Sequence, residues 1–375
     1  MDGKHFLVRR DRLSEHDTVT LPREPLAPGA VELRVDRFGF TTNNLTYGVV
    51  GDALGYWRFF PAARPGWGRL PVWGFGTVVR SAMDGIAPGE RFYGFFPMSS
   101  HLIVQPGRID DAGFLDAAAH RSGLSSVYNQ YLRTTHDPTY RADTEPYQMV
   151  LRPVFATAYF LADYLREQRW FGAEAILVSS ASSKLACALA FVLAGAARDA
   201  REVVGLTSPA NAGFVTRLGL FDRVVAYDEL ATLPVERRAV LVDIAGSSAV
   251  RGDVHRRLGD ALGRSISVGA THGVWPDAAG APSAPETVTF FTPAWIKHRT
   301  EQWTPGVVQQ RLAAAWDRFL GAVRDPARGW LTIELADGEA AVARAYDALV
   351  AGRGGADRGH VLSLAAEDSS AAAPA

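Results

Sequence analysis

A turn of small, hydroxyl-bearing residues is the first feature of this sequence that could do chemistry. A short apolar run ends at Ser179, a turn follows, and an Ala/Leu-rich stretch of helical character begins at Lys184. The first N–H groups of such a helix and its positive dipole end point at an anion, and serine hydroxyls can donate to phosphate oxygens. The glycines that usually let the backbone approach a pyrophosphate are absent. Two interpretations stand: a plain strand-to-helix turn, or a pyrophosphate seat that uses Ser180, Ser182, Ser183 and Lys184.

The residues at the end of the next apolar run distinguish between NAD(H) and NADP(H) as the cofactor. Val203-Val204-Gly205-Leu206-Thr207-Ser208 lacks the Asp or Glu that would hold a free ribose 2′-hydroxyl. Ser208 and Asn211 could hydrogen-bond a 2′-phosphate, and Arg217 or Lys184 could supply charge. The predicted cofactor is therefore NADP(H).

Tyrosines supply the candidate proton donors. A tyrosine hydroxyl can hydrogen-bond a developing oxyanion and regain its proton from solvent. The aromatic-rich segment over residues 43–73 contains Tyr47 and Tyr56, with Asn44 close by in sequence. Core packing explains each tyrosine at least as well as such a role.

A second polar and aromatic stretch, Tyr128-Asn129-Gln130-Tyr131, lies in a run of helical character. On a helix the two tyrosines would share one face, because residues three apart are neighbours there. Tyr128, Asn129 and Tyr131 are therefore candidate substrate contacts. The alternative is an amphipathic helix with buried tyrosines.

Composition excludes several classes of function. Cys187 is the only cysteine, so no disulfide and no cysteine-based zinc cage can form within the chain, and we expect no metal. The formal net charge of −1 gives no global attraction to nucleic acid or an anionic membrane. The N-terminus lacks the apolar stretch of a signal peptide, and serines interrupt the apolar segment 175–197. The expected location is the cytoplasm.

Two patterns divide the 375 residues, which suffice for two domains. Residues 1–110 read as short strands between Gly and Pro, which indicates a β-barrel or sandwich. The strands expected there are Val31–Val35, Gly76–Arg80, Glu90–Phe95 and Leu102–Val104. From about residue 155, apolar runs alternate with helical stretches, the pattern of a doubly wound parallel sheet. Its expected strands are Ala175–Ser179, Glu202–Leu206, Arg223–Val225, Val240–Ile244 and Ser265–Gly269, with helices at Lys184–Ala194, Ala210–Leu218 and Gly252–Leu262.

The expected domain boundaries follow from these patterns. The first domain covers 1–154 and is completed by about 328–366, the second covers 155–327, and 367–375 form a disordered tail. In the second domain, strands end near Gly246 and Gly269, at the sheet edge where open α/β folds bind ligands. Together with Thr157 these glycines would contact the cofactor, whereas Asp243 would fix its strand end.

Several motifs resemble the medium-chain dehydrogenase/reductase superfamily. Ala87-Pro88-Gly89-Glu90-Arg91-Phe92-Tyr93-Gly94 is similar to its "pGdrVyG" segment, and Ala156-Thr157-Ala158-Tyr159 to the start of its cofactor domain. Leu218-Gly219 and Val224-Val225-Ala226-Tyr227 resemble the "lGAdxvinY" segment of quinone and enoyl reductases. The resemblance implies a GroES-like β-barrel domain beside a Rossmann domain, with Tyr227 at the cofactor. Tyr56, after Gly55, is similar to the tyrosine of enoyl reductases, and Tyr47 and Asn44 lie in the stretch that lines the substrate pocket of quinone reductases. The resemblance therefore implies that Tyr56, Tyr47 and Asn44 are the catalytic residues.

The resemblance narrows to the DUF2855 group through Thr42–Gly48, Tyr128–Tyr131 and Ser179–Lys184. Where zinc-dependent relatives carry a cysteine ligand, this chain has Gly39-Phe40-Thr41-Thr42-Asn43. The expected function is zinc-independent, NADPH-dependent reduction of a conjugated enone, quinone or enoyl thioester. The alternative is a non-catalytic NADP(H)-binding protein or an accessory partner of a biosynthetic complex. The partner expected is a small molecule, and the resemblance leaves open whether the chain forms a homodimer, as many such proteins do.

Overall fold

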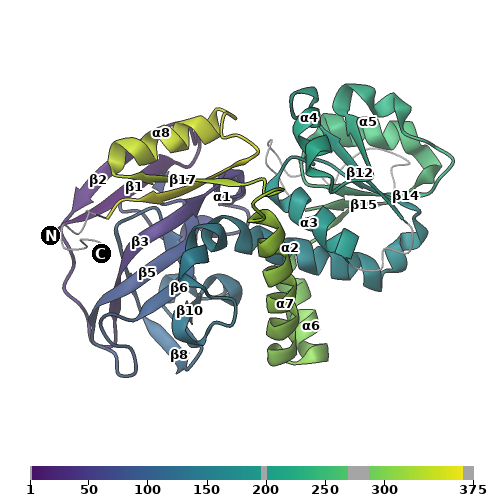
Figure 1. The fold of residues 1–375 in the computed structure, drawn as a ribbon. Helices are drawn as coiled ribbons and strands as arrows, with labels where there is room; N and C mark the ends of the chain where they lie inside the picture. Colours follow the sequence, from purple (N-terminus) through teal and green to yellow (C-terminus); the bar gives the residue numbers. More distant parts are fainter. Residues whose placement is uncertain (1, 196–200, 269–286, 366–375) are drawn as a thin grey trace. The chain divides into compact units, whose positions relative to one another are not determined.

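A computed structural model describes residues 2–195, 201–268 and 287–365, which form two compact units (Figure 1). The first unit comprises residues 1–150 and 333–375, and the second comprises 151–332. The expected tail 367–375 and Gly269 lie outside the described residues. In the part of the chain that the structure describes, no helix is long and apolar enough to cross a membrane.

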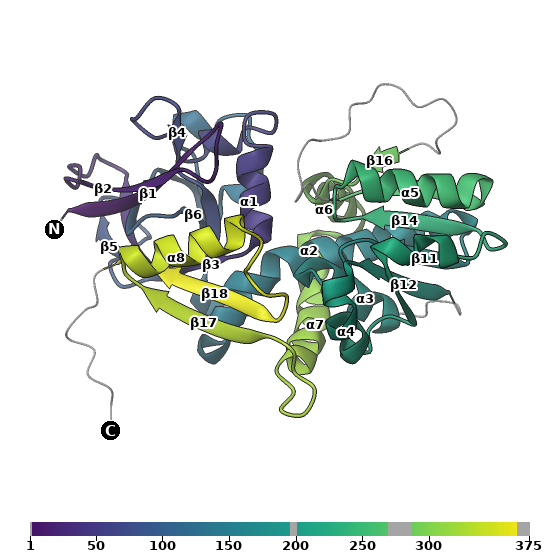
Figure 2. The ribbon, with the colours of Figure 1, turned by 90° about the horizontal axis from the view of Figure 1, so that it is seen from above.

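The first unit is built on antiparallel strands, as its alternation of buried and solvent-facing residues predicts. Its strands are β1 (Gly3–Arg9), β2 (His16–Leu21), β3 (Val31–Phe40), β4 (Trp67–Gly68), β5 (Pro71–Ser81), β6 (Arg91–Pro97), β7 (His101–Val104), β8 (Pro106–Asp110), β9 (Gly113–Asp116), β10 (Gln130–Arg133), β17 (Thr332–Asp337) and β18 (Arg358–Ser363). The main sheet has the order β17-β18-β3-β5-β6-β10-β9-β8, with β7 also paired to β3, and β2-β1-β4 form a smaller sheet. Helix α8 (Glu339–Val350) runs alongside β18, as Figure 2 shows in yellow.

The expected strands of the first unit are confirmed as parts of longer ones, except that Glu90 precedes the start of β6. The aromatic-rich segment is not one loop, because it contains helix α1 (Thr42–Val49) and a short 3₁₀ helix, η1 (Tyr56–Arg58), before β4. Most of its aromatic side chains are buried, including Trp57, Phe59 and Phe60. They therefore fill a core.

The second unit contains a parallel sheet in the order β13-β12-β11-β14-β15-β16. Its strands are β11 (Ala175–Val178), β12 (Glu202–Thr207), β13 (Arg223–Ala226), β14 (Ala239–Asp243), β15 (Leu262–Ser267) and β16 (Thr287–Thr289). Its helices are α2 (Glu145–Glu167), which begins in the first unit, α3 (Lys184–Gly195), α4 (Pro209–Leu218), α5 (Ser248–Leu258), α6 (Thr292–Trp303) and α7 (Pro305–Val323). This is the Rossmann strand order, in which the direction of winding reverses between the first and fourth strands, here β11 and β14.

The ends of the helices and strands in the second unit agree with the expected ones within a residue or two, except at α5 and β15. The expected helix Gly252–Leu262 begins earlier, at Ser248, and ends at Leu258. Gly259 follows with a φ of 49°, in the left-handed region that ends helices, and Leu262 already belongs to β15. An apolar run that spans a helix end and a strand start has no periodicity to separate them.

The helix expected across Tyr128 to Tyr131 is wrong. A single 3₁₀ turn, η3 (Ser126–Tyr128), ends there, and β10 begins at Gln130. Tyr131 pairs with Phe114 of β9 and is fully buried, so its side chain points into the sheet core. Its hydroxyl donates to the Phe95 carbonyl oxygen at 2.6 Å, and its ring stacks on Phe114 with centroids 4.9 Å apart.

Because its hydroxyl is hydrogen-bonded inside the core, Tyr131 should contribute to the stability of the fold. We expect Tyr131→Phe to lower the free energy of unfolding by about 1–3 kcal/mol, because it removes a hydrogen bond inside the core. Urea unfolding followed by circular dichroism measures the change. Tyr159→Phe is the matched control, since Tyr159 makes no hydrogen bond through its hydroxyl among the described residues. Equal stability of the two variants would contradict the assignment of Tyr131 to the core.

Candidate active site

A buried serine joins the ends of the two strands where the winding of the second unit reverses. The Ser179 hydroxyl donates to Asp243 Oδ1 at 2.8 Å and accepts from the backbone N–H groups of Ile244 and Ala245, each at 2.9 Å. Asp243 also accepts from the Gly246 N–H at 3.1 Å and pairs with Arg251 at 3.2 Å. Asp243 therefore fixes its strand end, as expected, and both loop starts are held in place.

The turn between β11 and α3 contains one residue in a conformation typical of glycine but has no glycine. Ser180 has a φ of 53°, the left-handed conformation that glycine normally supplies. Its N–H donates to the Tyr227 hydroxyl at 2.8 Å, so the tyrosine expected at the cofactor does lie at this turn. Ser183 precedes α3, and its hydroxyl accepts from the Ala186 N–H at 3.2 Å, which caps the helix.

Close packing behind the turn depends on small residues. A Cβ added to Gly205 of β12 would lie 2.9 Å from the Ala181 Cβ, so only glycine fits there. Ala186 and Cys187, in the first turns of α3, are fully buried. The turn can therefore sit tightly on the sheet with alanine and serine in place of the usual glycines.

The loop after β12 adjoins this turn. The Asn211 amide donates to the Ser182 hydroxyl at 3.2 Å, which brings two of the predicted cofactor residues together. Ser208 is the residue before α4, and its side chain makes no cap hydrogen bond with that helix. Thr207 and Ser208 end the strand without a carboxylate. The arrangement offers neutral hydroxyl and amide groups where a ribose 2′ position would lie.

The remaining predicted cofactor residues, Gly246, Lys184 and Thr157, lie on three different elements or loops. Gly246 is buried after β14 with a φ of 64°, beside Asp243. Lys184 begins α3 at the turn itself. Thr157 lies on α2, where its hydroxyl donates to the Pro153 carbonyl oxygen and accepts from Thr292 at 3.2 Å. These contacts do not link Thr157 to the turn.

The residues present fit a dinucleotide. Parallel strands bring the ends of β11, β12 and β14 to one edge of the sheet, and the turn at that edge is small and hydroxyl-rich. The Tyr227 hydroxyl accepts one hydrogen bond from Ser180 and keeps its own proton for an acceptor such as a phosphate oxygen.

Three tyrosines cluster in the first unit. The hydroxyls of Tyr56 and Tyr128 share a hydrogen bond of 2.9 Å, although 72 residues separate them in sequence. The Tyr47 ring lies 4.7 Å from that of Tyr56 and 6.2 Å from that of Tyr128. The Tyr47 hydroxyl accepts from Trp73 Nε1 at 3.1 Å and from the Asn43 amide at 3.2 Å. We call Tyr47, Tyr56 and Tyr128 the tyrosine cluster.

Burial keeps the phenols of this cluster protonated. Desolvation raises the pKa of Tyr47, Tyr56 and Tyr128 above the ordinary value of tyrosine, and most strongly for Tyr128. Tyr47 adds to the rise in the pKa of Tyr56, which the hydrogen bond with Tyr128 opposes, and both Tyr56 and Tyr47 add to the rise for Tyr128. Near neutral pH the cluster therefore presents neutral hydroxyl groups, which suit hydrogen-bond donation to an oxyanion.

Asn44 and Asn129, two of the predicted site residues, make hydrogen bonds outside the tyrosine cluster. Asn44 is buried, and its amide oxygen accepts from the Thr41 N–H at 2.8 Å while its nitrogen donates to the Pro71 carbonyl oxygen. These contacts hold the first turn of α1. Asn129 accepts from Arg121 at 3.4 Å. Tyr131, in the core beside Phe114, is not part of the tyrosine cluster.

Sequence reasoning missed residues that surround both groups. Ser179 and Arg251 complete the polar contacts of Asp243, and Trp73 and Asn43 hold the Tyr47 hydroxyl. The tryptophan belonged to the aromatic-rich segment, and Asn43 precedes Tyr47 by one helical turn, which was a usable signal. Among residues 2–195, 201–268 and 287–365, no three His, Cys, Asp or Glu side chains gather to hold a metal ion.

The fold is shared with solved oxidoreductase structures. CurA from Vibrio vulnificus in complex with NADPH superposes with a TM-score of 0.60 at 11% identity, over 97% of this chain and 99% of that one. The yhdH oxidoreductase from Salmonella enterica in complex with NADP gives 0.52 at 14% identity, over 96% and 99%. The CurK enoyl reductase gives 0.52 at 13% identity, also over 96% and 99%. No curated protein matches the sequence.

The two units thus correspond to the GroES-like and Rossmann domains of the medium-chain dehydrogenase/reductase fold. A family model matches residues 38–355, most of the chain. The chain belongs to the family described as Protein of unknown function (DUF2855).

Proposed function

We propose that this protein is a zinc-independent, NADPH-dependent reductase of a conjugated enone, quinone or enoyl thioester. The observation that carries the proposal is the turn at the reversal point of the Rossmann sheet, where Ser180 adopts the glycine-like conformation and Asn211 meets Ser182. Solved structures of the same fold that hold NADPH or NADP support it.

The preference for NADP(H) rests on the end of β12. A carboxylate there would accept from a free 2′-hydroxyl and repel a 2′-phosphate. Here Ser208 and Asn211 offer neutral donors, and Lys184 begins the adjoining helix as a cation. Ser180, Ser182, Ser183 and Tyr227 would hold the pyrophosphate, with Gly246 and Thr157 as further contacts.

When bound, NADPH supplies a hydride to an electrophilic carbon of the substrate. The protein must then stabilise the oxyanion and supply a proton. Cys187 is buried on α3, so the single cysteine is no ligand for an active-site zinc that would polarise the substrate. The tyrosine cluster is proposed to meet both needs.

The hydrogen bonds of the tyrosine cluster leave donors available. Since Tyr47 accepts from both Trp73 and Asn43, its own proton is directed away from them. In the Tyr56–Tyr128 pair one hydroxyl donates to the other, and the accepting phenol retains its proton for a further acceptor. Tyr56, fixed by both Tyr47 and Tyr128, is the proposed donor to the substrate oxygen, and Asn44 and Asn129 are proposed to support the loops around it.

One observation favours a second function, a non-catalytic NADP(H)-binding protein. The serine side chains occupy space at the turn where glycines usually let the backbone approach the pyrophosphate. In addition, the Ser180 N–H already donates to the Tyr227 hydroxyl. A fluorescence titration with NADPH, followed by its oxidation in the presence of enones and quinones, separates the two. Binding without oxidation of NADPH by any substrate would favour the second function, and no binding would exclude both.

The end of β12 generates a prediction of cofactor preference. We expect NADPH to bind at least tenfold more tightly than NADH, and Ser208→Asp to reverse the order, because the new carboxylate repels a 2′-phosphate. Isothermal calorimetry with both cofactors measures it. Thr216→Asp, which adds the same charge on the exposed side of α4, should leave the preference unchanged. Equal affinities in the unchanged protein would contradict the prediction.

The tyrosine cluster generates a prediction of turnover. We expect Tyr56→Phe to lower kcat about 10²–10³-fold, as the loss of one oxyanion donor does, with little change in NADPH affinity. Steady-state kinetics with the best substrate of the panel measures it. Tyr131→Phe is the control, because that hydroxyl is bonded inside the core.

The same measurement tests which of the three tyrosines is the proton donor. Tyr47→Phe and Tyr128→Phe are measured beside Tyr56→Phe. If all three keep near-normal turnover, the tyrosines are packing residues and the proton comes from another source.

A further inference from the structure

A cavity of about 420 Å³ lies within the first unit, apart from the hydroxyls of the tyrosine cluster. It is bounded by β1, β2, β7 and the segment around residues 59–64. Its apolar walls include Leu7, Val19, Phe59 and Phe60, and Leu21 at the wall is 46% exposed. A cavity of this size with mostly apolar walls and a few polar groups has the usual form of a small-molecule site.

Most charges around this cavity are paired. Glu32 is buried between Arg23 and Arg80, with its carboxylate 2.6 Å from Arg23. Arg121 is buried against Asp116 at 3.0 Å. Arg64, also on the wall, pairs with Asp17 at 2.8 Å. These pairs need no further counter-ion.

Arg69 is the exception. It is half-buried on the wall of the cavity, and no carboxylate lies within ion-pair distance of it among the described residues. One terminal nitrogen donates to the Pro61 carbonyl oxygen, while Nε is buried and has no hydrogen-bond partner. Burial lowers the pKa of Arg69, the attraction of Glu24 partly opposes this, and Arg121 adds a smaller lowering. A desolvated guanidinium with an unused donor is costly unless an anion meets it.

The imidazoles beside it add no further positive charge. His5 bonds to the Ser99 hydroxyl and His101 to the Ser100 hydroxyl, each at 2.9 Å, and His120 bonds to the Phe59 carbonyl oxygen. Burial lowers the pKa of all three, that of His5 to about 4. They are therefore neutral near pH 7. The wall carries four arginines, at positions 23, 64, 69 and 121, against three carboxylates, at 24, 32 and 116.

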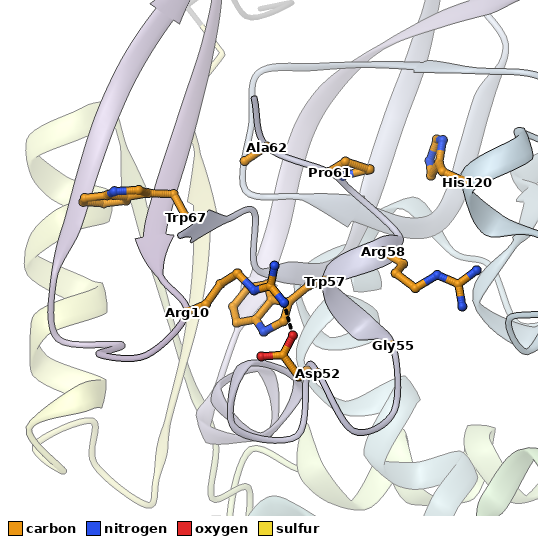
Figure 3. Close-up of a pocket in the computed structure, with 10 residues that line it drawn as sticks. Arg10, Asp52, Gly55, Trp57, Arg58, Pro61, Ala62, Trp67 and His120 are labelled. Carbon is orange, nitrogen blue, oxygen red and sulfur yellow. Dashed lines mark hydrogen bonds and ion pairs between the residues drawn. The ribbon is translucent and has the colours of Figure 1, made fainter. Parts of the chain in front are cut away.

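A second hollow, of about 490 Å³, shares Pro61, Ala62 and His120 with this cavity (Figure 3). Arg10 is joined to Asp52 beside the Trp57 ring, and Arg58, which donates to the Ser122 carbonyl oxygen, is exposed to solvent. This neighbour lacks the unmatched buried charge that distinguishes the Arg69 cavity.

We propose that the Arg69 cavity binds a monocarboxylate with an aliphatic body. The carboxylate would accept hydrogen bonds from the terminal N–H groups of Arg69, and the chain would lie against Leu7, Val19 and the two phenylalanines. The anionic head would meet Arg69, which has no ion-pair partner among the described residues. This proposal does not rest on the proposed reductase activity.

Binding of decanoate to the full chain without NADPH tests the site, with calorimetry as the readout. We expect one equivalent to bind, and Arg69→Met to weaken it about ten- to hundredfold, since hydrogen bonds to a charged group are lost. Arg58→Met is the matched control, because Arg58 lines only the neighbouring hollow. Thermal unfolding checks that both variants are folded.

A comparison of ligands tests the same claim with no substitution. The unchanged protein should bind decanoate at least tenfold more tightly than decanamide, which keeps the aliphatic body and lacks the charge. Absence of decanoate binding, equal affinity for the amide, or undiminished binding by Arg69→Met would each overturn the proposal.

Discussion

The hydrogen bond of 2.8 Å between the Ser179 hydroxyl and Asp243 is the contact on which the second unit depends. It ties the carboxyl ends of β11 and β14, the neighbouring strands from which the sheet winds in opposite directions. A buried carboxylate is costly without partners, and this one has Ser179, Gly246 and Arg251. The serine, in turn, satisfies two backbone N–H groups after β14. The start of both loops is thus over-determined, and the strained Ser180 that follows can persist.

The first unit solves a different problem, that of holding polar groups inside an aromatic core. Its tyrosine cluster is assembled from three separate segments, and each hydroxyl has a partner: Trp73 and Asn43 for Tyr47, and each other for Tyr56 and Tyr128. Low polarity around these phenols keeps them protonated, which makes them donors and poor bases. A phenol fixed in this way pays little ordering entropy when a ligand oxygen reaches it.

The Rossmann part of the fold could be predicted because its strands are fully buried apolar runs that end in small residues. The start of α3 at Lys184 and the ends of β12 and β13 follow from that pattern. The structure of the stretch around Tyr131 could not be predicted, because four residues are too few to distinguish helical from strand periodicity. Pairing with β9, a tertiary contact that no local pattern reveals, makes it a strand. The role of Asn44 in holding α1, and the Asp116–Arg121 pair, likewise arise from tertiary contacts that spacing alone does not reveal.

Phe59 belongs to two environments at once. Its ring lies 6.1 Å from that of Tyr56 and 5.5 Å from that of Tyr128, and it also forms part of the wall of the Arg69 cavity. Closely packed interiors pass small displacements on to their neighbours, so a ring shared in this way makes the two places thermodynamically linked. An occupant of the cavity that favours one position of Phe59 would change the affinity of the tyrosine cluster for its proposed ligand. By reciprocity, that ligand changes the affinity of the cavity by the same factor.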